Sequence, residues 1–167
     1  MRPAAHHVVA RSPTEFGDRE IDDFVAFVLA AGEVSPVGLR DRVMRAHTVA
    51  FLRRDECLLG VAGLKRPEPS YRARVAKSAG LSLPREEFEF ELGWIFILPS
   101  ARGTKLSFPL CEPVIQAAGD AGIFATSRAS NTGMHVTLKK LGFSRKGAEW
   151  PSKQVDENLQ LFVNHAV

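Results

Sequence analysis

The stretch from Glu87 to Gln116 reads EFEFELGWIFILPSARGTKLSFPLCEPVIQ, and the fold of the chain is organised around it. Its first six residues alternate between acidic and apolar side chains, and this period of two predicts a strand with one apolar and one acidic face. Gly93 interrupts the alternation and predicts a bulge or a close approach to the backbone, ahead of the apolar run from Trp94 to Leu98. Pro99 ends the strand.

A glycine-containing turn follows this strand and leads directly into a predicted helix. The turn is Arg102-Gly103-Thr104-Lys105, and the helix carries apolar residues on one face at Leu106, Leu110, Val114 and Ala118. A strand, a short turn and a helix direct several unpaired N–H groups and the positive end of the helix dipole at one point. The unit therefore predicts an anion site, usually for a phosphate. It contains neither a Walker pattern nor a G-x-G-x-x-G fingerprint.

Length and composition limit the classes of function. A chain of 167 residues predicts a single domain over 1–167, with 45% hydrophobic and 25% charged residues. The net charge of +3 permits an anionic ligand, but the 22 basic residues are interspersed with 19 acidic ones, so we expect no DNA partner. The longest apolar run is too short to span a bilayer, which predicts no membrane segment. Cys57 and Cys111 lack metal-type spacing and indicate reduced thiols of a cytoplasmic protein without a metal site.

The rest of the chain predicts strands and helices that complete a mixed sheet. Asp18 is the expected N-cap of a first helix, and Ser35-Pro36 is expected to open a second one that runs to about Ala46. Ser130 or Asn131 is expected to cap the last helix. The predicted strands besides the central one are 7–11, 48–52, 57–64, 123–127, 143–146 and 159–163.

With this order, the chain resembles the GNAT superfamily of acyl-CoA-dependent N-acetyltransferases over nearly its full length. The segment ILPSARGTKLS resembles the family's strand and pyrophosphate loop, and ASNTGMHVTLKKLGF resembles its later helix and strand. The resemblance implies an α/β (α+β) fold: a mixed, largely antiparallel seven-stranded sheet with splayed central parallel strands and flanking helices. Lys105 replaces the second small residue of the loop, Ser100 replaces the usual glutamine or arginine, and Leu138 replaces the tyrosine that commonly protonates the leaving thiolate.

The resemblance also implies how acetyl-CoA binds. The free edge of the central strand at Phe96, Ile97 and Leu98 would pair with the amides of the pantetheine arm as another strand does. The pyrophosphate would be held by the amides of Arg102, Gly103, Thr104, Lys105, Leu106 and Ser107, and Asn131 would contact the cofactor near the thiol. A lysine in the first turn of a helix is unfavourable next to the dipole unless an anion is bound there. We therefore predict that Lys105 contacts a phosphate of coenzyme A; the alternative is a side chain that simply extends into solvent.

Acetyl transfer to an amine needs a base, and Glu91 is the predicted one, because apolar neighbours would desolvate its carboxylate and make it a stronger base. Glu89 is the second candidate, acting through water, and the alternative is that both are solvated strand carboxylates. A backbone amide near Ile97 would stabilise the oxyanion. Ser127, Ser130 and His135 are the remaining candidates for the general acid.

The acceptor is an unidentified primary amine, and alternatives of other classes stay open. The chain could be a non-catalytic acyl-CoA-binding module, or it could acylate an RNA-borne amine such as that of an aminoacyl-tRNA. The connection from Lys65 to Pro84 is either a wall of the acceptor site, with Tyr71 and Arg72 near it, or a plain insertion. A homodimer is left open as well.

Overall fold

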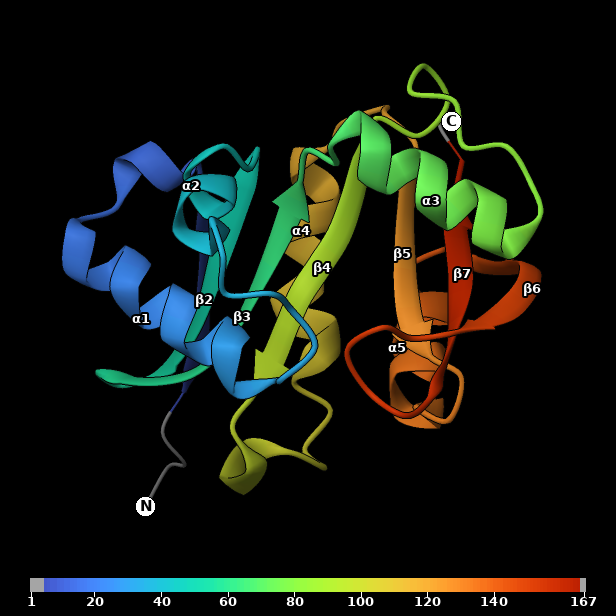
Figure 1. Ribbon diagram of the computed structural model, residues 1–167. Coiled ribbons are helices and arrows are strands. Elements are labelled where there is room, and N and C mark those ends of the chain that lie inside the picture. The colour runs from blue at the N-terminus through green and yellow to red at the C-terminus, as the bar shows by residue number, and fades with distance from the viewer. Residues whose placement is uncertain (1–4, 166–167) are drawn as a thin grey trace.

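Seven strands form one twisted sheet in the computed structural model, which describes residues 5–165. All neighbouring strands are antiparallel except the parallel pair β4 and β5 at the centre (Figure 1). This arrangement confirms the predicted fold class. Across the sheet the order is β1 (His6–Arg11), β2 (Thr48–Arg54), β3 (Cys57–Lys65), β4 (Phe90–Ile97), β5 (Ile123–Arg128), β7 (Asn158–Asn164) and β6 (Ser144–Pro151).

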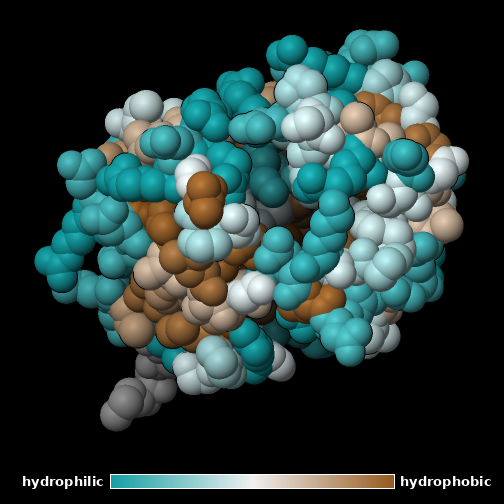
Figure 2. Space-filling view, viewed as in Figure 1, coloured by the Kyte–Doolittle hydropathy of each residue, from teal (hydrophilic) through white to brown (hydrophobic). Residues whose placement is uncertain are grey.

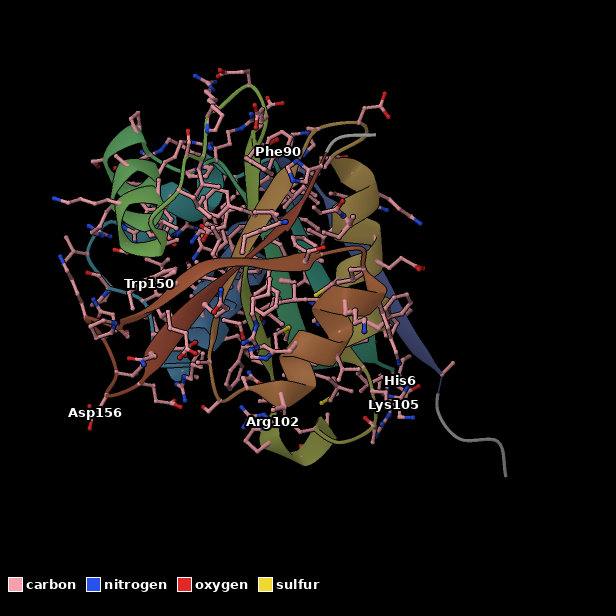
Figure 3. The ribbon with its side chains drawn as sticks, turned by 90° about the vertical axis from the view of Figure 1, so that its right-hand side faces the viewer. His6, Phe90, Arg102, Lys105, Trp150 and Asp156 are labelled. Atoms are coloured by element: carbon pink, nitrogen blue, oxygen red, sulfur yellow. The ribbon has the colours of Figure 1, made fainter. Side chains whose placement is uncertain are left out.

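Helices cover both faces of the sheet. One face carries α1 (Asp18–Ala30), α2 (Leu39–Met44) and α3 (Pro69–Ala79), and the other carries α4 (Ser107–Ala117) and α5 (Thr132–Lys140). Figure 3, turned by 90° from Figure 1, shows α3 on one side of the sheet and α4 with α5 on the other. Two 3-10 turns, Pro13–Glu15 and Pro99–Ala101, complete the elements.

The apolar core is divided by the sheet because side chains on a strand alternate between its faces. In β2, Val49 and Phe51 pack with α1 and α2, whereas Ala50 and Leu52 pack with α4. These four side chains are at most 1% exposed. A buried strand that faces helices on both sides therefore carries apolar residues at every position, as parts of β3 and β5 also do.

Neither of the first two helices begins at its predicted position, so these predictions were wrong. Gly17, not Asp18, is the N-cap of α1, and its amide donates to the Glu20 carboxylate at 3.1 Å. The second helix begins at Leu39 and not at Pro36. Arg42 donates hydrogen bonds to the carbonyls of Val37 and Ser35, which holds the segment before α2 as a turn.

The connection from Lys65 to Pro84 contains a helix that contributes to the core. Val75 and Ala79 of α3 are buried, and they pack with Phe124 of β5 and Leu161 of β7. Gly80, in the left-handed conformation with φ 74°, ends the helix. An insertion without contacts does not bury apolar side chains, so this segment belongs to the fold.

The central strand begins later than the alternating pattern predicts, because the first residues of that pattern form a turn. The amides of Glu87 and Phe88 both donate to the Pro84 carbonyl at 3.0 Å, and regular pairing of β4 begins at Phe90. Phe88 therefore packs with the α3 cluster, while Phe90 and Leu92 pack with the α4 side. The prediction that these three share one face was wrong for Phe88.

Candidate active site

The two parallel strands at the centre of the sheet separate after a short contact. Only Phe90 pairs with Ile123 and Glu91 with Phe124. Beyond Glu91 the strand β4 stays paired with β3, whereas β5 stays paired with β7. The predicted splay is therefore present, and β4 has an edge along Leu92–Ile97 that no strand covers.

A cavity of about 830 Å³ opens at this splay and reaches both faces of the sheet. On one face it is bordered by α3, the segment after α1 and the segment after β6, and on the other by α5. Figure 2 shows a hollow near the middle of the first face, between side chains that are mostly hydrophilic. Groups from opposite sides of the sheet can therefore meet in one space.

A bulge in β4 determines which side chains face this cavity. The register with β3 shifts between Val61 and Gly63, and Trp94 has a φ of 55°, a left-handed value that is rare for a bulky residue. The bulge follows Gly93, as the sequence predicts. The extra residue changes the parity of the strand: Leu92 faces the α4 side before the bulge and Ile95 faces it afterwards. Glu91 and Trp94 consequently both lie toward the other face.

Glu91 lies in this cavity as a buried carboxylate and not as a solvated one. Its side chain is 2% exposed. The Tyr71 hydroxyl on α3 donates to Oε2 at 2.7 Å, and Nζ of Lys65 at the end of β3 lies 3.0 Å from Oε1. That second contact is an ion pair without hydrogen-bond geometry, so Oε1 has no hydrogen-bond donor among the described residues. Burial, followed by the Glu91 carboxylate, raises the pKa of Tyr71 well above its ordinary value, which keeps the phenol a donor.

Lys65 is held over two aromatic rings. Its ammonium lies 4.9 Å from the centre of the Trp94 ring and 5.3 Å from that of Tyr71. The Lys65 side chain is 21% exposed, so its ammonium borders the cavity. The indole N–H of Trp94 is buried and has no hydrogen-bond partner among residues 5–165.

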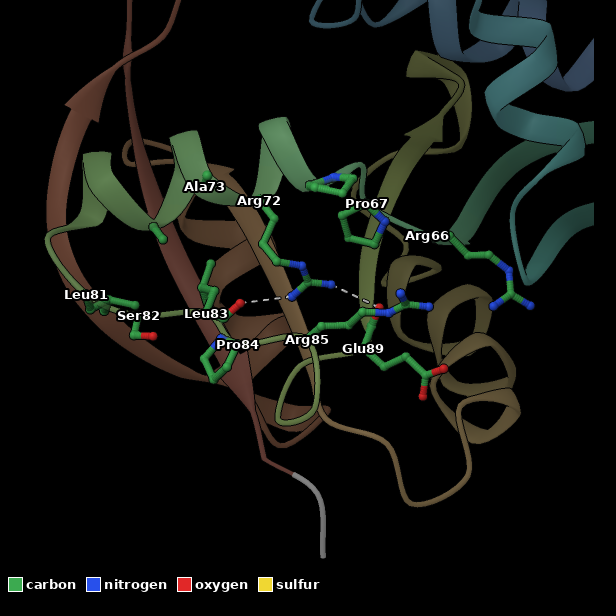
Figure 4. A pocket seen from close by; sticks show the side chains of 12 residues that line it. Arg66, Pro67, Arg72, Ala73, Leu81, Ser82, Leu83, Pro84, Arg85 and Glu89 are labelled. Atoms are coloured by element: carbon green, nitrogen blue, oxygen red, sulfur yellow. Dashed lines mark hydrogen bonds between the residues drawn. The ribbon is translucent and has the colours of Figure 1, made fainter.

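The second carboxylate candidate lies elsewhere. Glu89 is exposed and lines a separate pocket of about 680 Å³ between α3 and the segment 81–85 (Figure 4). Arg72 also faces this pocket, and it donates to the carbonyls of Leu83, Phe88 and Glu89. Arg72 therefore fixes the segment before β4. Of the two α3 residues predicted near the acceptor, only Tyr71 lines the cavity with Glu91.

The free edge of β4 at its far end carries main-chain groups that point away from β3. Because Leu98 N donates to Leu59 O, the alternation of antiparallel pairing turns the amide and carbonyl of Ile97 toward the opening. The Ile97 carbonyl accepts a hydrogen bond from Arg102 Nε at 2.8 Å, and the guanidinium lies 5.3 Å from the centre of the Phe96 ring. Phe96, Ile97 and Leu98 are partly buried here.

The turn between β4 and α4 has two left-handed residues, Gly103 with φ 81° and Lys105 with φ 60°. Lys105 thus takes the conformation that a glycine favours at this position, although a side chain is present. The helix begins at Ser107 with Leu106 as its N-cap, so the prediction that Lys105 lies in the first helical turn was wrong. Thr104 Oγ1 donates to Ala101 O at 2.7 Å and stabilises the turn. Figure 3 shows Arg102 and Lys105 at the end of the molecule opposite Phe90.

Asn131 caps α5, which decides between the two predicted caps. Its side chain accepts a hydrogen bond from the Met134 amide at 3.1 Å, and the residue lines the cavity. Leu138, where the family motif has a tyrosine, also lines it. Of the three acid candidates only Ser127 borders the cavity; the Ser130 hydroxyl donates to Glu157, and His135 contacts Arg128 O and Arg145.

Sequence reasoning missed Lys65 and Trp94 at this site. Lys65 is the last residue of an apolar strand, and a single cation after such a strand ordinarily lies in solvent. Its role follows only from the antiparallel pairing of Lys65 with Glu91. That pair is visible in the sequence only if the register between β3 and β4 is already known.

No group of three or more potential ligands could hold a metal ion among residues 5–165. Within the same range no helix has both the length and the apolar character that a membrane crossing requires.

Comparisons with known proteins were made with both sequence and structure. A scan against protein-family models and a search of curated protein sequences each found no match. Solved structures do match. An acyl-CoA N-acyltransferase from Pseudomonas aeruginosa superposes with a TM-score of 0.68 at 14% identity, covering 96% of this chain and 99% of that one. A GNAT-family acetyltransferase from Streptococcus agalactiae gives a TM-score of 0.66 at 15% identity, with 96% of each chain covered.

A third match has a ligand in its structure. YncA from Salmonella typhimurium, a candidate acetyltransferase solved with its cofactor acetyl-CoA, gives a TM-score of 0.62 at 15% identity, covering 95% of this chain and 93% of that one. Identities this low establish the fold and nothing finer. The splayed parallel pair, the bulged strand and these superpositions together show that the chain has the GNAT acetyltransferase fold.

Proposed function

We propose that the protein transfers an acetyl group from acetyl-CoA to a primary amine, with Glu91 as the general base. The observation that carries this proposal is the position of Glu91. A carboxylate that is 2% exposed borders the cavity at the splay, and one of its oxygens lacks a hydrogen-bond donor. The Lys65 ammonium lies 3.0 Å from this oxygen without donating to it, so an amine that enters the cavity can supply the hydrogen bond.

The residues of β4 and the following turn fit acetyl-CoA. The amide and carbonyl of Ile97 face the opening and can pair with an amide of the pantetheine arm. The left-handed Gly103 and Lys105 and the first turn of α4 supply amides for the pyrophosphate. Arg102 donates a hydrogen bond to the Ile97 carbonyl in the structure. When the pantetheine arm pairs with that carbonyl, the Arg102 side chain can move to a phosphate of the cofactor. Asn131 lies where the cavity approaches α5.

The chain's part in the reaction is proton transfer and orientation. Glu91 takes the proton from the acceptor amine, and Tyr71 holds the carboxylate in place. The nitrogen adds to the acetyl carbon while the electron pair of the carbonyl double bond moves onto oxygen; when this oxyanion collapses, the carbon–sulfur bond breaks and its electron pair leaves with sulfur. The predicted donor to the developing oxyanion is a backbone amide of β4 near Ile97 on its Glu91 side, because the Ile97 amide itself pairs with the pantetheine arm. Ser127 is the remaining candidate for the acid, and a thiolate can also leave without one.

The acceptor is not decided by the fold. Structures of similar score include one named as the ribosomal-protein-S18-alanine N-acetyltransferase of Escherichia coli and one named as a candidate phosphinothricin N-acetyltransferase. Their acceptors, as named, differ greatly in size. The single domain over 1–167, the cytoplasmic location and the open homodimer remain predictions within this proposal.

The test combines binding with turnover. Acetyl-CoA at millimolar concentration should raise the thermal midpoint, because a ligand that binds only the native state adds to its stability. Turnover with a panel of amines should be followed by loss of thioester absorbance, since the exposed Cys57 would react with a thiol reagent. Binding without turnover of any amine would favour the non-catalytic module, and absence of any thermal shift in folded protein would refute the proposal.

Two carboxylates provide the controls. Glu89→Gln tests the second predicted base, and Glu87→Gln removes an exposed carboxylate that lines neither pocket. Both should keep the turnover of the parent protein, whereas Glu91→Gln should lose it. Loss of turnover in Glu89→Gln alone would assign the base to Glu89.

A further inference from the structure

The cavity at the splay has more positive charge than its own carboxylates balance. Seven Lys and Arg residues line it, against three Glu residues. This local excess is larger than the net charge of +3 of the whole chain. Arg102 and Lys105 are not among the seven, so the excess is separate from the predicted phosphate loop.

Each of the three carboxylates already has a cation beside it. The pairs are Glu33 with Arg128, Glu68 with Arg45 at 3.3 Å, and Glu91 with Lys65 at 3.0 Å. Arg42 is engaged with main-chain carbonyls. Among residues 5–165, Arg66, Arg74 and Lys153 form no ion pair with a carboxylate. An anion brought by the ligand is the missing partner for this charge.

The Lys65–Glu91 pair restricts what kind of amine can enter. An amine that binds as an ammonium at Glu91 places a second cation beside a carboxylate that Lys65 already neutralises. Two cations beside one carboxylate repel each other in a partly buried site. The free-energy cost of removing water from the second cation is then not offset by a second carboxylate. If the ligand has a carboxylate close to its ammonium, Lys65 can turn to that carboxylate while Glu91 receives the ammonium. The buried pair then exchanges partners with a zwitterion, and no charge is left alone.

We infer that the acceptor is a free α-amino acid, whose carboxylate is bound by Lys65 and Arg74 while its amine lies at Glu91. This inference rests on the proposed function and names its substrate class. Arg74 is on α3 one turn after Tyr71, and its guanidinium lies 5.4 Å from the centre of the Tyr71 ring. Tyr71 also donates a hydrogen bond to Glu91, so the Arg74 guanidinium and the Glu91 carboxylate both lie against the Tyr71 side chain.

The experiment compares α-amino acids with their own carboxamides, methyl esters and dipeptides as acceptors, with acetyl-CoA loss as the readout. The carboxamide and ester have less basic amines, so at neutral pH more of each is present as the reactive free base. Chemistry alone therefore favours the derivatives, and a preference for the free acid measures recognition of the carboxylate. We expect kcat/KM to be at least about tenfold higher for the amino acid than for its carboxamide, the value of one charge-assisted contact.

The matched variants are Arg74→Ala and Lys77→Ala, which remove one cation each from α3; Lys77 does not line the cavity. Arg74→Ala should raise KM for the amino acid about tenfold and for the carboxamide far less, and Lys77→Ala should change neither. Equal or better use of the carboxamide, or an equal effect of Arg74→Ala on both acceptors, would overturn the inference. Preference for the ester would likewise overturn it. Turnover of no amine at all would instead refute the proposed function.

Discussion

Replacing Glu91 by Gln separates the stability of the buried ion pair from its chemical role. The variant keeps the shape of the side chain and a hydrogen-bond acceptor for Tyr71, but leaves the Lys65 ammonium without its carboxylate. Removing one partner of a buried pair costs about 3–5 kcal/mol when the other charge stays buried. Lys65 is 21% exposed and can turn toward water, so we expect a loss of about 2 kcal/mol in the free energy of unfolding. For a chain of this length the thermal midpoint should then fall by about 4–8 °C.

Turnover should fall by about 100-fold or more, the usual contribution of a general base. The double variant Lys65→Met/Glu91→Gln tells the two effects apart. Replacing both charges by uncharged groups of similar shape should return most of the lost stability, because no charge is left buried alone. Turnover should stay low, because no carboxylate accepts the proton.

The cycle is completed by measuring thermal unfolding and steady-state acetyl transfer for four proteins: the parent, Glu91→Gln, Lys65→Met and the double variant. If the double variant is as unstable as the sum of the single ones, Lys65 and Glu91 are not coupled. If Glu91→Gln retains full turnover while folded, Glu91 is not the base.

Three further predictions concern Lys105 and the bulge in β4. Lys105→Ala should weaken coenzyme A binding without lowering turnover at saturation. If the variant loses as much affinity for dephospho-coenzyme A as for coenzyme A, Lys105 contacts the pyrophosphate. If its affinity for coenzyme A is unchanged, Lys105 extends into solvent. Lys105→Gly should raise the free energy of unfolding by about 1 kcal/mol, since φ is 60° at this position, and chemical denaturation measures it. Gly63→Ala should destabilise the protein by at least about 1–3 kcal/mol, because its Cβ would lie 2.6 Å from Trp94 Cε3 at the bulge. Unchanged stability of Gly63→Ala would mean that Trp94 moves freely and that the bulge is not rigid.

Local patterns in the sequence were sufficient for the order of the elements and for the turn after β4. Alternation and glycine position depend on neighbouring residues, so the strand, the bulge after Gly93 and a cap at Ser130 or Asn131 could all be predicted. The starts of α1 and α2 could not. Glu20 accepts from the amide of Gly17, which has no side chain to mark it as an N-cap, and Arg42 binds main-chain carbonyls, which every residue carries.

The site itself depended on pairings between distant segments. The sequence presented Glu91 as the last of three alternating acidic residues and ranked it above Glu89 only by its apolar neighbours. Strand register placed Lys65 opposite Glu91, and the docking of α3 on β5 and β7 brought Tyr71 onto the same carboxylate. Burial removed water from Glu91 and left Glu89 exposed, because β4 begins at Phe90 and the residues before it form a turn. A strand's period tells which side chains share a face, but only tertiary packing decides which of them lose contact with water.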